Sequence, residues 1–326
     1  MSLKLYTTAD YDKYTKIRVG ETKFGEELSP IQQIEDLASH HAKFVVLGVP
    51  ENIGIRVNHG NSNAHKAWES FLGAFLNIQV NAYNNAHDVL LLGEIITKDY
   101  MQQAENMKMP EDTDEMGKLV EQIDDDLSKI IKLIVDADKI PIVIGGGHNN
   151  AFGMIKGTHL ALEKPINVIN IDAHTDFRRL ENRHSGNGFS YAKSKAYLDK
   201  YFVFGLHKNY TSDAIFKEFD DSKSLKYELY EDLEHLTTLD KTVRFKSALN
   251  FVQQNFGLEL DCDAIQDFPS SAQSPSGFSM PEVRTFIKIA RKSKCQYLHI
   301  CEAAPHETMQ VGKAISYFVS DFIRAY

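Results

Sequence analysis

The sequence predicts an α/β fold in which helices flank a mostly parallel central sheet. Short apolar runs recur along the chain, longer segments with helical periodicity separate them, and no internal repeat or low-complexity linker interrupts the alternation. Buried parallel strands are apolar on both faces, and strands that alternate with helices join one sheet through right-handed crossovers. We therefore expect a single three-layer domain over residues 41–326, preceded by a partly helical N-terminal extension over residues 1–40.

The strands and helices of this domain are assigned from the pattern of apolar residues. The expected strands are Phe44–Val49, Val89–Leu92, Pro141–Ile144, Ile166–Ile171, Tyr201–Phe204, Leu258–Leu260 and Gln296–Ile300. The expected helices are Ala64–Leu76, Met116–Ala137, Phe152–Leu162, Lys241–Asn255, Pro281–Ser293 and Val311–Ala325. In the second of these helices, Leu119, Ile123 and Leu127 recur at the four-residue spacing of a buried face.

The charge of the chain limits its partners. Its formal net charge is −9, whereas a nucleic-acid or anionic-membrane surface requires a basic excess. No apolar run reaches the 18 or so residues of a membrane span, and residues 1–10 lack the apolar core of a signal peptide. We expect a small-molecule substrate, with no nucleic-acid or membrane partner.

Cysteine usage indicates the compartment. Cys262, Cys295 and Cys301 are three in number and include no Cys-x-x-Cys pair. This is neither a disulfide framework nor a thiolate zinc site, so a reducing cytoplasm is the expected location.

Chemistry-bearing residues follow three of the expected strands, where ligands bind in open α/β sheets. They are His148 after Gly145–Gly147, the run Asp172, His174 and Asp176, and the pair Asp261 and Asp263. Crowded carboxylates repel one another, and divalent cations remove that repulsion. Alternate residues of a strand share a face, so the members of each run can act together.

Each motif alone has another reading, because a Gly-rich turn or a capping Asp pair is common without metal. Their joint occurrence after three strands favours a metal site. Imidazole and carboxylate ligands without a thiolate suit manganese, and zinc, iron, cobalt or nickel are compatible. A hydroxide can bridge two such ions about 3.5–4 Å apart, and the ions then activate it for attack.

These motifs resemble those of the arginase-like superfamily, which includes arginase, agmatinase and formimidoylglutamase. The matching segments are Gly145–His148, Asp172–Asp176, Ser185–Asn187, Asp261–Asp263 and Glu302 near the last strand. The resemblance implies two Mn²⁺ ions and often a homo-oligomer, a trimer or hexamer. It implies that His148, Asp172, Asp176 and Asp261 hold one ion, and that His174, Asp172, Asp261 and Asp263 hold the other.

The resemblance also implies roles in catalysis. Asp176 would move a proton, His174 would act within the metal centre, and Glu302 would face the planar cation of the substrate through paired hydrogen bonds. An ion pair at the sheet edge is the structural alternative for Glu302. Arg178 and Asn187 join Glu302 as the expected substrate-binding residues.

The loop after Asp176 bears on the substrate. Phe189 stands where arginases have a histidine, as it does in formimidoylglutamases, which also favour an arginine at the position of Arg178. N-formimidoyl-L-glutamate carries two carboxylates that guanidinium groups suit, whereas agmatine carries none. Solvation or ion pairing is the alternative for Arg178, Arg179 and Arg183, and Asn187 with Gly188 departs from the Thr-Pro of that family's loop.

The sequence therefore predicts a binuclear-metal hydrolase that converts N-formimidoyl-L-glutamate and water to L-glutamate and formamide, a step of histidine breakdown. A guanidine hydrolase of the agmatinase, arginase or guanidinobutyrase type, which would release urea, is the first alternative. The second is a catalytically silent metal-binding subunit, although all six expected metal ligands are present.

Overall fold

A nine-stranded sheet runs through the described residues, 2–306 and 310–324, of the computed structural model. Its strands are β1 Leu3–Leu5, β2 Phe44–Gly48, β3 Val89–Ile95, β4 Ile140–Ile144, β5 Ile166–Ile171, β6 Leu198–Leu206, β7 Leu225–Leu229, β8 Phe256–Asp261 and β9 Cys295–Cys301. They lie in the order β1-β3-β2-β4-β9-β8-β5-β6-β7, and all neighbouring pairs except β1 with β3 are parallel.

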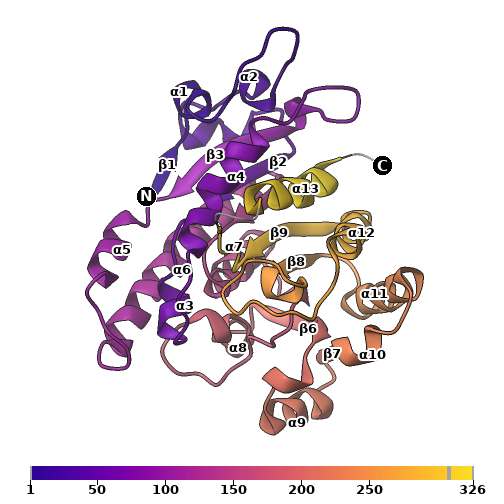
Figure 1. Cartoon of the computed structure of the whole chain (residues 1–326). Coiled ribbons are helices and arrows are strands. Elements are labelled where there is room, and N and C mark those ends of the chain that lie inside the picture. The colour runs from indigo at the N-terminus through magenta and orange to yellow at the C-terminus, as the bar shows by residue number, and fades with distance from the viewer. Residues whose placement is uncertain (1, 307–309, 325–326) are drawn as a thin grey trace.

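Helices cover both faces of this sheet (Figure 1). They are α1 Thr8–Asp12, α2 Phe24–Glu27, α3 Ile53–Val57, α4 Ala67–Phe75, α5 Lys98–Ala104, α6 Thr113–Asp136, α7 Ala151–Leu162, α8 Gly188–Ser194, α9 Asp213–Asp221, α10 Tyr230–Leu233, α11 Thr238–Val252, α12 Met280–Arg291 and α13 Val311–Ile323. Because successive strand residues point to opposite faces, Phe44 and Val46 join the core beneath α4 and α13, whereas Val45 and Leu47 join the core beneath α6 and α7.

The predicted architecture is confirmed. All seven expected strands and all six expected helices form, and Ala64–Lys66 begins the first of these helices as a 3-10 turn. The end of the last predicted helix, at residue 325, falls outside the described residues. β1 and β7, which lie at the two edges of the sheet, were not predicted from the sequence. Edge strands bury less surface: Lys226 is exposed within β7, so the apolar pattern is interrupted there.

The N-terminal residues are partly helical, but they also extend the sheet. β1 pairs antiparallel with β3, and Tyr11 is buried with its hydroxyl donating to the Leu91 carbonyl at 2.7 Å. Phe24 stacks edge-on against Phe75 of α4. Residues 2–40 therefore share the core of the domain rather than forming a separate unit.

The topology determines where chemistry can take place. β4, β9, β8 and β5 are consecutive in the sheet, and residues at or next to their carboxyl ends pair in register, Ile144 with Ile300, Ile300 with Leu260, and Leu260 with Ile171. Parallel strands end at the same edge, so the loops after them meet there. Among the described residues, no helix has the length and apolar character needed to cross a bilayer.

Candidate metal centre

The turn after β4 is built around glycines. Gly145 and Gly146 have φ of 97° and 75°, in the left-handed region that side chains disfavour. A Cβ on Gly146 would lie 2.3 Å from Asn150 Nδ2 and 2.6 Å from Glu51 Oε1. Glycine is therefore required here, and it allows the chain to turn sharply into His148.

Two buried carboxylates fix the backbone of this turn. The Gly147 N–H donates to Glu51 Oε1 at 2.8 Å, and the His148 N–H donates to Glu302 Oε1 at 2.6 Å. Glu51 is fully buried and also accepts from the Ile53 N–H and from Asn150 Nδ2. The position of His148 is consequently set from both sides before any ligand binds.

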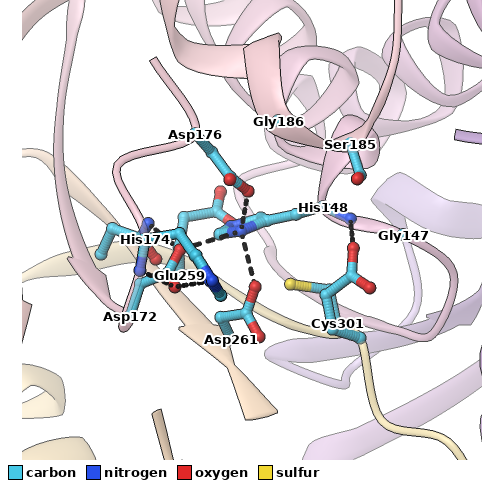
Figure 2. A network of polar contacts seen from close by, with 12 residues as sticks. Gly147, His148, Asp172, His174, Asp176, Ser185, Gly186, Glu259, Asp261 and Cys301 are labelled. Atoms are coloured by element: carbon cyan, nitrogen blue, oxygen red, sulfur yellow. Dashed lines mark hydrogen bonds and ion pairs between the residues drawn. The ribbon is translucent and has the colours of Figure 1, made fainter. Parts of the chain in front are cut away.

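The His148 ring faces three carboxylates (Figure 2). Its Nδ1 lies 2.8 Å from Asp176 Oδ2, 3.1 Å from Asp261 Oδ2 and 3.3 Å from Asp172 Oδ2. One donor atom from each of the four residues falls within 4.8 Å of the others, and all four come from the ends of β4, β5 and β8. The structure thus brings together the four residues expected to hold one ion.

The residues expected to hold a second ion lie beside this group. His174 Nδ1 is 3.5 Å from Asp172 Oδ1 and 3.8 Å from Asp263 Oδ2. Asp263 is further positioned by its N–H, which donates to Asp261 Oδ1, and by the Ala272 N–H, which donates to Asp263 Oδ1. This second group is more open than the first, because the His174 side chain is 27% exposed.

The electrostatics of the cluster fit divalent cations. Burial raises the pKa of Asp261 well above its usual value, and the charges of Asp263 and Asp172 raise it further. Burial raises the pKa of Asp176 and of Asp263 as well. Burial alone would lower the pKa of His174, but its hydrogen bond with Asp172 and the nearby carboxylates raise it to about 10. An imidazole and carboxylate donor set with such excess negative charge suits a hard or borderline divalent metal.

A cavity of about 490 Å³ opens over these residues. His174, Asp176, Asp261, Asp263 and Glu302 line its floor. Glu302 has φ of 60°, a backbone conformation unusual for a residue with a side chain, and its Oε2 is buried without a hydrogen-bond partner. Burial raises its pKa to about 8, and the charge of Asp263 adds to this. A cation bound against Glu302 would reverse that effect.

The three arginines of the loop after Asp176 have different environments. Arg178 lines the cavity, and its Nη1 donates to Asn58 Oδ1 at 2.6 Å. Arg179 is 86% exposed and pairs with Glu181 at the surface. Arg183 is buried; its Nε donates to Asp124 Oδ2 at 2.9 Å, and it also contacts aromatic rings. Only Arg178, of the three, can meet a ligand in this cavity.

Asn187 does not take the expected place at the substrate. It is fully buried, its Nδ2 donates to the Asn182 carbonyl at 2.9 Å, and its Oδ1 accepts from the His184 N–H at 3.1 Å and from Arg183. Because these bonds hold the side chain inside the loop, the expectation that Asn187 binds substrate needs correction to a role in loop structure. Phe189 is also buried, with its ring 5.1 Å from that of His148.

Two charged or polar residues beneath the centre were not singled out from the sequence. Glu259 and His299 are fully buried, and His299 Nδ1 lies 2.5 Å from Glu259 Oε2. Both precede a site residue in a central strand, Glu259 two residues before Asp261 and His299 three before Glu302. A buried charge in a central strand is the signal that could have revealed them.

The family model described as Arginase family matches residues 42–319. The chain belongs to the arginase family. The match covers every residue of both proposed ligand groups and excludes the whole N-terminal extension, residues 1–40.

Two bacterial formimidoylglutamases are similar in sequence to part of the chain. The chain is 29% identical over 192 residues to a formimidoylglutamase of Macrococcus caseolyticus. The aligned stretch covers 58% of this chain and 60% of that protein. It is 34% identical over 125 residues to a formimidoylglutamase of Streptococcus pyogenes, 36% of this chain and 38% of that protein. The matched stretches thus span less than two thirds of these relatives.

Solved structures share the fold. A structure of Trypanosoma cruzi formiminoglutamase with Mn²⁺ superposes with a TM-score of 0.73 at 18% identity, covering 93% of this chain and 97% of that one. Formimidoylglutamase from Bacillus subtilis gives a TM-score of 0.70 at 17% identity, with 95% and 96% coverage. These neighbours confirm a single arginase-like α/β domain.

Proposed function

We propose that the chain is a metal-dependent hydrolase that converts N-formimidoyl-L-glutamate and water to L-glutamate and formamide. The observation that supports this most directly is the combination within one cavity of an acidic floor, the unpartnered Glu302 Oε2 and the Arg178 guanidinium. A substrate with a planar cation at one end and carboxylates at the other matches that arrangement of charge. The sequence similarity to formimidoylglutamases supports the same substrate.

The residues that would hold the metal follow from the two donor groups. His148, Asp172, Asp176 and Asp261 would hold one ion, and His174 with Asp263 would hold a second, sharing Asp172 and Asp261. We propose Mn²⁺ for both, as the resemblance implies. When bound, such ions lower the pKa of a water and polarise the carbon under attack.

The chain's own residues then bind and orient the substrate. Glu302 is held rigidly, because its Oε1 accepts from the His148 N–H, and its Oε2 is left to receive an amidinium N–H. Arg178 would pair with a substrate carboxylate, and this is supported by its place in the cavity lining, where Asn58 orients the guanidinium.

Proton transfer is assigned to Asp176. Its carboxyl lines the cavity next to the proposed attack position, where it would lie within reach of the attacking water. It would take the proton from the attacking water and deliver it to the glutamate nitrogen as the carbon–nitrogen bond breaks.

A guanidine hydrolase remains the second candidate function, because Glu302 would bind a guanidinium equally well. Arg178 disfavours agmatine, which has no carboxylate to pair with it. Phe189 disfavours the arginase reaction, because the buried ring leaves no proton-transferring group at that position. A silent metal-binding subunit would explain neither the cavity nor the free Glu302 oxygen.

The test is steady-state turnover of the Mn²⁺-loaded protein on formimidoylglutamate, arginine, agmatine and guanidinobutyrate, with a chelator-treated control. We expect glutamate release from formimidoylglutamate alone, abolished by the chelator. Urea release from a guanidine would overturn the substrate assignment, and two bound ions without turnover would favour the silent subunit.

We also propose a cytoplasmic homo-oligomer, a trimer or hexamer, on the basis of the family resemblance. Light scattering coupled to size-exclusion chromatography measures the mass directly. A monomer of 36.9 kDa would contradict this proposal without affecting the chemistry.

A further inference from the structure

β8 and β9 carry matched polar side chains on the face that leads to the metal centre. Glu259 pairs in register with His299, and Asp261 pairs with Cys301. Residues two apart in a strand share a face, so Glu259 lies one step deeper in the sheet than Asp261. β4, which delivers His148, is the neighbour of β9 on its other side.

Glu259 is fully buried and has three polar neighbours. Its Oε1 accepts from the Tyr297 hydroxyl at 2.8 Å, and its Oε2 lies 2.5 Å from His299 Nδ1. The same Oε2 is 3.5 Å from Nε2 of His148, a nitrogen that is buried without a hydrogen-bond partner. Figure 2 shows Glu259 beside the His148 ring and among the carboxylates of the centre.

The neighbouring residues indicate that this arrangement is built into the sheet. Gly257 pairs with Tyr297, and a Cβ on Gly257 would lie 2.0 Å from the Tyr297 Cζ. A glycine weakens a strand interior and often marks a site of close approach. Here it provides the space that lets the Tyr297 ring place its hydroxyl against Glu259.

We propose that Glu259 is a positioning residue for the metal centre, which it serves by accepting the Nε2 proton of His148. That bond would fix the ring and the tautomer, so that the Nδ1 lone pair faces Asp172, Asp176 and Asp261. Outer carboxylates of this kind also make a ligating imidazole more basic. The inference rests on the metal centre of the proposed function.

His299 and Tyr297 complete the device by holding Glu259. Each donates to a different oxygen of the carboxylate, so the side chain cannot rotate away from His148. A carboxylate isolated in the core would be strongly unfavourable, whereas one with two donors and an imidazole is satisfied.

An additional metal site is the alternative in this region, because donor atoms of His148, His299 and Cys301 also lie within 4.8 Å of one another. A metal bound there would need the second nitrogen of His148, whose Nδ1 already faces the carboxylate group. The Cys301 thiol donates to the Leu260 carbonyl at 3.7 Å. The geometry therefore favours a hydrogen-bonded support over an additional metal site.

The test is the stepwise Mn²⁺ affinity of Glu259→Gln, measured by competition with a chelator, together with thermal unfolding of the metal-free protein. Glu282→Gln is the matched control, since Glu282 is also a buried carboxylate but pairs with Lys241 elsewhere. We expect one of the two ions to bind about 10–100-fold more weakly in Glu259→Gln, which is the usual effect of losing such a partner. The other ion, and both ions in the control, should bind as in the wild type.

Two further variants keep the test decisive if Glu259→Gln folds poorly. His299→Asn retains a donor near the position of Nδ1 and should preserve the affinity, whereas His299→Leu should lower it. The Co²⁺-loaded proteins provide a second readout, because the visible spectrum should change in Glu259→Gln and His299→Leu but not in His299→Asn.

Three outcomes would overturn the proposal. Unchanged affinity in Glu259→Gln would exclude a positioning role, and equal weakening of both ions with a large loss of metal-free stability would indicate a merely structural one. Loss of a bound ion in Cys301→Ser would show that His148, His299 and Cys301 themselves form a metal site. If the wild type binds no Mn²⁺ at all, it is the proposed function that fails.

Discussion

The floor and the rim of the cavity differ in how they are built. On the floor, Asp261, Asp263 and Glu302 lie at or just after the ends of central strands and are at most 3% exposed. On the rim, Arg178 stands on a loop and Tyr210 ends the single 3-10 turn Lys208–Tyr210, where it is 49% exposed. Strand ends place a side chain through sheet register, whereas loops place it through contacts that no periodicity reveals. Sheet register therefore sets the positions of the expected metal ligands, whereas loop contacts set which side chains a substrate would meet.

Arg178 and Arg183 show the same contrast within one loop. They are five residues apart, yet one lines the cavity and the other is buried against Asp124. Nothing in the residue type separates them, because both guanidinium groups suit a carboxylate. The difference arises from α6, which presents Asp124 to one arginine and not to the other.

The largest effect is expected on the floor. Asp261→Ala removes a shared ligand, so turnover and bound metal should both fall by more than the ~100-fold typical of an outer partner. Metal analysis and steady-state kinetics measure these two quantities. Asp213→Asn, at an 81% exposed surface ion pair, is the control. Full metal content with full turnover in Asp261→Ala would refute the metal assignment.

Next in size is the buried arginine. Arg183→Ala leaves Asp124 buried without its partner, which typically costs about 3–5 kcal/mol of unfolding free energy. Denaturant unfolding measures this loss. Arg179→Ala, which removes an exposed pair, should change stability by at most about 1 kcal/mol. Equal losses of unfolding free energy in the two variants would mean that the buried Arg183 pair stabilises the fold no more than the exposed Arg179 pair.

A smaller effect is expected at the rim. Arg178→Ala should raise KM for formimidoylglutamate and lower kcat/KM by roughly ten- to a hundredfold, because a hydrogen bond to a charged group contributes about 1.5–3 kcal/mol. The metal content should be unchanged. If Arg179→Ala shows the larger loss instead, the substrate carboxylate is bound by a different arginine.

The smallest effect concerns pH. Burial lowers the pKa of His184 to about 4 against the pull of Glu181. The unfolded chain therefore binds a proton between about pH 6.5 and 4 that the folded chain does not, and stability is lost as pH falls through this window. His184→Asn should lose less stability between pH 7 and 4.5, as unfolding free energies would show. His235→Asn, at an exposed histidine, is the matched control.

The contrast between floor and rim also explains how much could be predicted from the sequence. The seven central strands, six of the helices and the expected ligand positions at the strand ends were predictable, because burial on both faces leaves a clear apolar pattern in the strands. Short helices such as α3, α5, α8 and α9 were missed. β7 was missed because Lys226 and Glu228 interrupt that pattern at the sheet edge.

The side-chain roles that could not be predicted from the sequence depend on tertiary contacts. The side chain of Asn187 is oriented by Arg183 and Asn182, and no local pattern indicates whether it points into the cavity or away from it. Glu51 lies about a hundred residues before the turn that it fixes, so its role appears only once β2 and β4 are adjacent.

The most direct test of the central claim is anomalous diffraction from crystals of the Mn²⁺-loaded protein. We expect two peaks about 3.5–4 Å apart. One should lie within bonding distance of His148 Nδ1 and Asp176, and the other of His174 and Asp263. A single peak at His299 and Cys301, or no peak at the ends of β4, β5 and β8, would contradict it.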